Sequence, residues 1–195
     1  MLKKIRSNPI DRAGSLARIW ALLEQVLDPE IPVVSIRELG ILRDVRLNAN
    51  DEIDIIITPT YSGCPAMGQI EDDVQAALKQ ANLQAKVITQ LAPAWTTDWM
   101  TEAAKTKLRD YGIAPPQHLA NQLGVHSSTI QFATKNIAAR AHSTLASSTF
   151  RSHNVPCPRC SSINTTETSH FASTACKALY KCLDCLEPFD YFKPY

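Results

Sequence analysis

Two pairs of cysteines near the C-terminus constrain the fold of this chain more than any other feature of its sequence. Each pair has the spacing Cys-x2-Cys, and residues 161–181 separate the pairs, which are Cys157 with Cys160 and Cys182 with Cys185. Two such pairs can place four thiolates around one point, in the tetrahedral arrangement that zinc prefers. A segment of about 40 residues cannot sustain a hydrophobic core unaided, whereas structural zinc contributes roughly 10–16 kcal/mol of folding free energy. The spacing therefore predicts a zinc ribbon with a closed, structural metal site, although an iron–sulfur cluster or a rubredoxin-like iron would use the same ligands.

Cys176 is a fifth cysteine in the same segment, and several uses stay open for it. It follows Cys160 after 15 intervening residues, and it could replace a ribbon ligand, cap a neighbouring strand or serve as a separate thiol. Lys177 beside it favours the thiolate form. The alternative is a buried, inert cysteine. We therefore predict Cys176 only as an additional thiol.

Cys64 stands where an apolar strand pattern ends and a helical pattern begins. The β-branched run of residues 53–57 is typical of a strand, and residues 70–78 carry apolar side chains at the spacing of one helical face. Pro65 suits the first position of a helix, which would put Cys64 at or beside the N-cap. Because unpaired backbone N–H groups and the helix dipole favour a thiolate there, we expect a reactive or metal-binding thiol. The alternative is a small buried hydrophobic residue at a strand–helix junction.

Three residues are candidate neighbours of Cys64. Thr60 lies in the same stretch, and Asp28 and Glu30 lie in the sequence DPEIP, whose prolines cannot continue the preceding helix. Carboxylate oxygens and a thiolate sulfur are both metal ligands, so these side chains could complete a site around the thiol. The alternative for the two carboxylates is a solvated turn that only ends the helix.

Apolar periodicity predicts the order helix, strand, strand, helix, strand, helix for the first part of the chain. The expected strands cover residues 39–47, 53–58 and 85–91, and the expected helices contain residues 16–26, 70–78 and 100–111. Gly112 fits just past the last helix. Trp95 and Trp99 could form a binding surface, but paired aromatic residues near a helix start more often belong to a core.

This pattern predicts an α+β chain with two domains. A small α/β two-layer sandwich would occupy residues 1–114, and the zinc ribbon would occupy residues 154–195. Between them, residues 115–153 read as a linker with short helices. Residues 119–130 have the spacing of a helix–turn–helix. Because DNA-binding proteins of that type have a third helix and a denser basic face, we expect a helical hairpin or a flexible spacer instead.

Composition excludes several classes of protein. The 195 residues are 45% hydrophobic and 20% charged with a net charge of +1, so nothing points to nucleic acid or to a membrane. No apolar run approaches membrane-spanning length, and no apolar signal segment follows the N-terminal lysines. We therefore expect a cytoplasmic protein. In that compartment six cysteines indicate metal binding or reactive thiols rather than disulfides.

Four sequence motifs occur in order along the chain. They are DPEIPV at residues 28–33, PTYSGCPA at 59–66, LAPAWTTDWM at 91–100 and STACKALY at 173–180. Together they resemble the D subunits of phenylacetyl-CoA ring-epoxidase systems, the PaaD family, over residues 15–116 and 154–193. The resemblance implies a first domain similar to SufT-like iron–sulfur assembly proteins, on whose motif Asp28 and Cys64 fall, and a zinc ribbon that carries the four paired cysteines. The chain departs from the family at residues 192–195, FKPY, where a cysteine usually follows Phe-Lys.

The resemblance also implies a function. It indicates an auxiliary subunit that assists iron–sulfur or di-iron centre assembly in aerobic phenylacetate catabolism, with transient iron or a cluster at Cys64 and zinc in the ribbon. The partners would be the oxygenase and reductase subunits, and a homodimer stays open. The alternative is a non-catalytic structural or regulatory docking subunit of the same complex. Because the sequence contains no Gly-rich phosphate loop, nucleophile elbow or flavin signature, we expect an accessory subunit that is not an enzyme by itself.

Overall fold

A computed structural model of the chain describes residues 9–117 and 155–195, with side chains from Gly14 onward in the first range. The expected linker therefore lies outside the described residues apart from its first three positions. The helix–turn–helix spacing at residues 119–130 lies outside them as well. None of the helices in the described ranges is long and apolar enough to cross a membrane.

The first domain has the element order that the sequence predicts. Its elements are α1 (Pro9–Leu23), β1 (Leu42–Leu47), β2 (Ile53–Ile57), α2 (Met67–Gln80), β3 (Lys86–Thr89), the 3-10 helix η1 (Thr97–Trp99) and α3 (Glu102–Tyr111). The strands form one sheet of order β1-β2-β3, in which β1 and β2 are antiparallel and β2 and β3 are parallel. Because parallel neighbours need a crossover, α2 connects β2 to β3. The α+β architecture expected from the sequence is confirmed.

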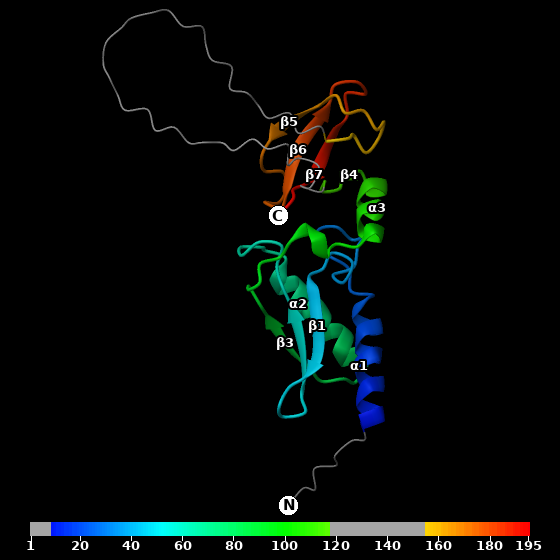
Figure 1. The fold of residues 1–195 in the computed structure, drawn as a ribbon, viewed down its shortest axis with the longest axis vertical. Coiled ribbons are helices and arrows are strands. Elements are labelled where there is room, and N and C mark those ends of the chain that lie inside the picture. Colours follow the sequence, from blue (N-terminus) through cyan, green and yellow to red (C-terminus); the bar gives the residue numbers. More distant parts are fainter. Residues whose placement is uncertain (1–8, 118–154) are drawn as a thin grey trace, which may run out of the picture.

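The core of this domain lies between the sheet and the helices α1 and α2 (Figure 1). Ile19 and Leu23 of α1 and Ile55 of β2 are fully buried in it. The helix α2 contributes Ile70, Val74 and Leu78, the spacing that the sequence shows. Ile56, on the opposite face of β2, is also buried.

The ends of the elements are set by local hydrogen bonds. The helix expected to contain residues 100–111 begins at Glu102, because Met100 is extended and Thr101 caps α3 by accepting a hydrogen bond from Ala104 N at 3.1 Å. Gly112 ends α3 in the left-handed conformation with φ 95°, as expected for a residue just past a helix. A second glycine, Gly40, has φ 74°, and a Cβ there would lie 2.7 Å from Trp99 Cβ.

The second domain is a four-stranded sheet to which the first part of the chain contributes a strand. Its strands are β4 (Ile113–Ala114), β5 (Thr165–Ser169), β6 (Lys177–Cys182) and β7 (Pro188–Phe192), in the order β4-β7-β6-β5. The strands β5, β6 and β7 are antiparallel neighbours, whereas β4 follows α3 directly and pairs with β7 in parallel. The sequence analysis placed the end of the first domain at residue 114. That boundary puts β4 in the first domain, although β4 completes the sheet of the second.

Aromatic residues join the two domains. Phe192 at the end of β7 is 1% exposed and belongs to the core of the first domain. Its ring centroid lies 5.9 Å from that of Trp95, and the Tyr195 ring lies 6.2 Å from Trp95 in a T-shaped contact. The C-terminus lies between the two sheets (Figure 1), where the Thr97 N–H donates to the Tyr195 carbonyl at 3.3 Å. Trp95 is 4% exposed and belongs to the core. The sequence analysis favoured this core position over a binding surface.

We expect Phe192→Ala to lower the free energy of unfolding by about 3–5 kcal/mol, because it removes a fully buried aromatic side chain. Phe171 provides a matched control, since it lies in the same domain but is 63% exposed. Phe171→Ala should change the free energy of unfolding by no more than about 0.5 kcal/mol. Urea unfolding followed by circular dichroism measures both values, and equal losses would contradict this account of the interface.

Candidate functional site

The four paired cysteines of the second domain lie together. The sulfur atoms of Cys157, Cys160, Cys182 and Cys185 are all within 4.8 Å of one another. Cys157 Sγ and Cys185 Sγ are 3.7 Å apart, and Cys160 Sγ and Cys182 Sγ are 3.6 Å apart. Four sulfurs at about 2.3 Å from a tetrahedral ion would be about 3.8 Å from one another. The sulfur positions therefore fit a single metal ion, and the cluster is a metal-binding set.

Hydrogen bonds hold the two cysteine loops against each other. The Asn164 side chain donates to Asp184 Oδ1 at 2.7 Å, and the Ser162 hydroxyl donates to the other oxygen of the same carboxylate. The Cys185 N–H points at the Cys182 sulfur at 3.5 Å and lowers the pKa of that thiol to about 7. The pKa of the Cys185 thiol is instead raised to about 12, so the four thiols differ in how readily they give up a proton to a metal.

Cys176 does not join this cluster. It is 4% exposed and packs in the core of the first domain, although it lies at the start of the second. Burial raises the pKa of Cys176, and the opposing charge of Lys177 does not reverse that rise. The expectation that Lys177 would favour the thiolate of Cys176 is therefore wrong. Lys177 Nζ is engaged by Asp190 Oδ2 at 3.2 Å.

Cys64 lies in the loop between β2 and α2. The helix begins at Met67 with Ala66 as its N-cap, so Cys64 is two residues before the cap. The expectation that Pro65 is the first helical residue is therefore wrong. The Ala66 N–H hydrogen-bonds to the Cys64 sulfur, and the Thr60 side chain hydrogen-bonds to it too. The side chain of Cys64 is half-buried against the core.

The two predicted carboxylates lie next to this loop. Asp28 is 6% exposed, and its Oδ1 accepts hydrogen bonds from Glu30 N at 2.9 Å and Ile31 N at 2.8 Å. These bonds fix the segment that follows α1. Both Asp28 and Glu30 interact electrostatically with Cys64. Asp28, Glu30 and Thr60 thus lie near enough to act on Cys64, but among the described residues only the ribbon cysteines form a group of three or more closely spaced metal-ligand atoms.

The electrostatics of Cys64 differ from the prediction. Burial is the main cause that raises the pKa of Cys64, and the charges of Glu30 and Asp28 raise it further. The hydrogen bonds from Ala66 and Thr60 lower it by less, so the net shift is upward. The prediction that the helix N-terminus makes Cys64 a thiolate is therefore wrong. It leaves out the carboxylates that the fold places nearby, which raise the pKa of the thiol. Burial also raises the pKa of Asp28. A metal that binds here must compete with a proton.

The second domain supplies neighbours that sequence reasoning missed. The Thr174 side chain hydrogen-bonds to Glu30, and the Lys177 charge acts on both Asp28 and Glu30. Tyr61 has a pKa raised by burial and then by the charges of Cys64 and Cys176. Thr174 and Lys177 lie in the sequence STACKALY at residues 173–180. That motif is the sequence feature that could have drawn attention to Thr174 and Lys177. No local sequence pattern, however, shows that the motif faces Cys64.

Comparison with protein families assigns each domain separately. Residues 16–88 match the model of the family described as iron-sulfur cluster assembly protein. Residues 141–193 match the model described as PaaD zinc beta ribbon domain. The first match contains Cys64 with its neighbours, and the second contains the four-cysteine cluster.

Comparison with individual proteins gives a relative that matches along nearly the whole chain. A protein of Escherichia coli K12, named as the putative D subunit of 1,2-phenylacetyl-CoA epoxidase, is 45% identical over 176 residues, which is 90% of each chain. The Fe-S protein maturation auxiliary factor YitW of Bacillus subtilis is 38% identical over 46% of this chain and 89% of its own length. A crystal structure of a DUF59 domain from Bacillus anthracis is 33% identical, with a TM-score of 0.47, over 52% of this chain and 97% of that chain.

We expect Asp28→Asn to leave the free energy of unfolding at pH 7 unchanged or higher, because the amide oxygen keeps both backbone hydrogen bonds and removes a charge that burial disfavours. Asp28→Ala should lower it by about 1–3 kcal/mol, since two N–H groups lose their acceptor. Urea unfolding at pH 7 compares the variants. A loss in Asp28→Asn as large as that in Asp28→Ala would contradict this view of the carboxylate.

We expect Cys157→Ser to lose the metal of the four-cysteine cluster, because a structural site of this kind needs all four sulfurs. Cys176→Ser is the matched control, since Cys176 lies in the same domain but outside the cluster. Elemental analysis after gel filtration should find about one bound ion per chain in the control and in the unaltered protein. Loss of the ion from Cys176→Ser would show that the ligand set is wrong.

Proposed function

The chain belongs to the family of the D subunit of 1,2-phenylacetyl-CoA epoxidase, and from this premise we propose that it is an auxiliary subunit that helps to assemble an iron–sulfur or di-iron centre of an epoxidase system. The setting would be aerobic phenylacetate catabolism. The partners would be the oxygenase, which would receive the di-iron centre, and the reductase, which would receive the iron–sulfur cluster.

The observation that carries the proposal is the position of Cys64 among Asp28, Glu30 and Thr60. This group lies in the domain that matches the iron–sulfur cluster assembly family. A thiolate sulfur is the usual ligand of iron in clusters, and carboxylates are ligands of non-haem iron. The thiol is half-buried, so it is protected from bulk solvent but reached without unfolding the domain.

These residues would act on iron as cargo. Cys64 would bind it through sulfur, and the two carboxylates would place negative charge beside a cation. Asp28 is held in one orientation by two backbone N–H groups, which fixes one side of the site before iron arrives. Thr60 would hold the sulfur through its hydrogen bond.

The ribbon would have a different, structural task. We infer that its metal is zinc, because residues 141–193 match the family described as PaaD zinc beta ribbon domain, and the four cysteine sulfurs fit the tetrahedral shell that zinc prefers. Zinc would hold the two cysteine loops together and supply folding free energy to a small sheet. It would take no part in handling the cargo.

A second candidate function is a structural or regulatory docking subunit of the same complex. The observation in its favour is that the E. coli relative is named as a subunit of the epoxidase. This function predicts stable co-purification with the oxygenase and no dependence on Cys64. The two functions therefore differ in how they respond to a single substitution.

We expect iron in the purified reductase or oxygenase to fall in cells that lack the chain, and the unaltered chain to restore it. Cys64→Ser should fail to restore iron, because the ligand sulfur is gone. Ser62→Ala is a matched control in the same loop, since Ser62 is exposed, and it should restore iron fully. Iron per protein is measured after anaerobic purification.

Normal iron in both partners without the chain would overturn the proposed function. Full restoration by Cys64→Ser, together with co-purification, would favour the docking subunit instead. The amounts of reductase and oxygenase protein serve as the control for expression.

A further inference from the structure

The loop that joins β6 to β7 lies at the end of the ribbon opposite to the aromatic contact with the first domain. The strand β6 begins directly after Cys176 and β7 ends at Phe192, and both of these residues belong to the core of the first domain. Because β6 and β7 are antiparallel, the loop between them, residues 183–187, lies at the other end of the two strands (Figure 1). The first domain therefore leaves this loop uncovered.

Three large apolar side chains are exposed at this end. Leu186 is 64% exposed, Leu183 is 48% exposed and Ile163 is 62% exposed. The Leu183 N–H donates to the Asn164 carbonyl at 2.8 Å, which holds the loop of Ile163 against the loop of the two leucines. None of the three belongs to either buried cluster of the described residues. Single exposed apolar residues are ordinary, but three on two touching loops are typical of an interaction surface, and we call them the tip patch.

Leu186 also has an unfavourable backbone conformation. Its φ is 65°, in the left-handed region, where the Cβ of an L-residue crowds the following carbonyl oxygen. Ser161, with φ 61°, occupies the equivalent position after the first cysteine pair. A glycine would adopt this conformation without strain and would expose no apolar side chain. A leucine here lowers the stability of the chain in two ways, which is expected where a side chain serves binding rather than folding.

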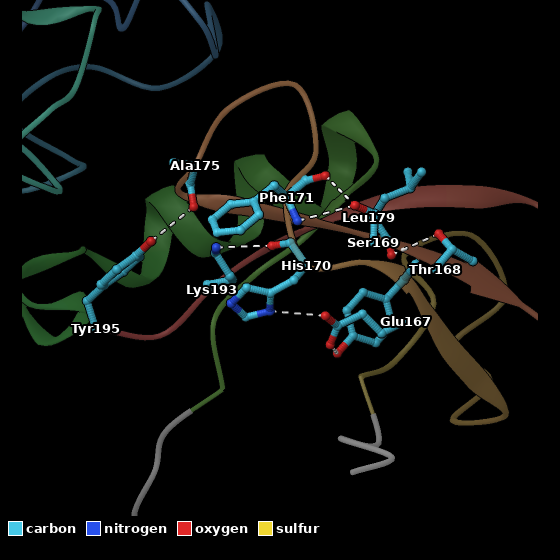
Figure 2. A network of polar contacts seen from close by, with 10 residues as sticks. Glu167, Thr168, Ser169, His170, Phe171, Ala175, Leu179, Lys193 and Tyr195 are labelled. Atoms are coloured by element: carbon cyan, nitrogen blue, oxygen red, sulfur yellow. Dashed lines mark hydrogen bonds and ion pairs between the residues drawn. The ribbon is translucent and has the colours of Figure 1, made fainter. Parts of the chain in front are cut away.

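Phe171 is another exposed apolar residue of the ribbon, but it has partners within the chain. Lys193 Nζ lies 4.4 Å from the centroid of its ring, and the His170 ring packs on it edge-on at 5.0 Å. Figure 2 shows how this loop is held, with Lys193 Nζ bonded to the His170 carbonyl and the Tyr195 hydroxyl bonded to the Ala175 carbonyl. Contacts within the chain therefore account for Phe171, which makes it a control for the tip patch.

The charges around the tip patch indicate what kind of partner it fits. The exposed residues Asp184 and Glu187 are matched in number by the exposed residues Arg159 and Lys181. Four thiolates around one divalent ion add about two negative charges. Because this end of the ribbon is then negative overall, a second copy of the chain, a nucleic acid and an anionic membrane are disfavoured. A protein surface with an apolar cleft bordered by arginine or lysine is complementary to it.

The relatives of the chain indicate which protein carries such a surface. The match to the maturation factor YitW has the size of the first domain alone. The E. coli relative matches along 90% of both chains, so the match includes the ribbon, and this relative is named as a subunit of the epoxidase. The ribbon is therefore the part that distinguishes an epoxidase subunit from a separate maturation factor.

We propose that the tip patch is a docking surface for the oxygenase of the epoxidase system, which would receive it in an apolar cleft bordered by basic side chains. This inference rests on the proposed function for the identity of the partner. It gives the chain two separate tasks, since the tip patch binds the oxygenase while the first domain handles iron.

Binding is measured by calorimetry between the full chain, with its ribbon metal in place, and oxygenase purified from cells that lack the chain. We expect Leu183→Ser and Leu186→Gly each to weaken binding at least about tenfold, because burying one leucine side chain corresponds to about that factor in affinity. Phe171→Ala should bind as the unaltered chain does. Leu186→Gly should keep or raise the urea midpoint of unfolding, since glycine relieves the left-handed backbone, so its weaker binding would not reflect misfolding.

Glu187→Lys tests the charge of the partner surface. Binding of the unaltered chain should weaken as the salt concentration rises, and Glu187→Lys should slow association with the oxygenase. Faster association of this variant would overturn the basic border of the cleft.

A photoreactive side chain identifies the occupant of the patch directly. The variant Leu186→p-benzoylphenylalanine is irradiated in the full chain mixed with oxygenase, and the crosslinked peptides are identified by mass spectrometry. Crosslinks to the oxygenase would support the proposal. Crosslinks only to a second copy of the chain, or only to residues 118–154 of the same chain, would overturn it.

The outcomes separate this inference from the proposed function. Unchanged binding by both leucine variants, or no binding of oxygenase by the unaltered chain, would overturn the docking surface, and a fall of iron in cells that lack the chain would still support the assembly function. Binding that is lost in the leucine variants, with normal iron in those cells, would support the docking surface and overturn the assembly function.

Discussion

The packing of Phe192 and Tyr195 on Trp95 is the contact on which the arrangement of this molecule depends. It closes the first core with a side chain from the last strand of the ribbon. It also brings the loop before β6 to the loop between β2 and α2, where Cys64 lies. Without this contact each domain would keep its own sheet, but the charges and thiols at the interface would no longer face one another.

The two sets of thiols differ in their surroundings, and each setting suits a different residence time for a metal. In the ribbon, four sulfurs enclose one point and leave no open position. At the interface, burial and carboxylates raise the pKa of Cys64, so a proton competes with the metal. A permanent structural ion suits the first setting, and reversible binding of cargo suits the second.

Local sequence patterns predicted most of the elements and the ribbon ligands, because these depend on neighbours along the chain. The spacing of apolar side chains in residues 70–78 predicted the buried face of α2, and Gly112 predicted the end of α3. The group of Asp28, Glu30, Thr60 and Cys64 could also be proposed. The raised pKa of Cys64 could not, because it depends on burial and on carboxylates that only the tertiary fold brings near. The position of Cys176 and the strand β4 were missed for the same reason, since both are set by contacts between distant segments.

The strand β4 changes the meaning of the segment that follows it. This strand comes before residues 118–154 in the sequence, yet it pairs with β7 of the ribbon sheet. Both ends of the segment are therefore attached to the same sheet, so topologically it is an insertion within the ribbon rather than a tether between domains. The docking of the two domains therefore does not run through that segment, because β4 joins α3 of the first domain directly to the ribbon sheet.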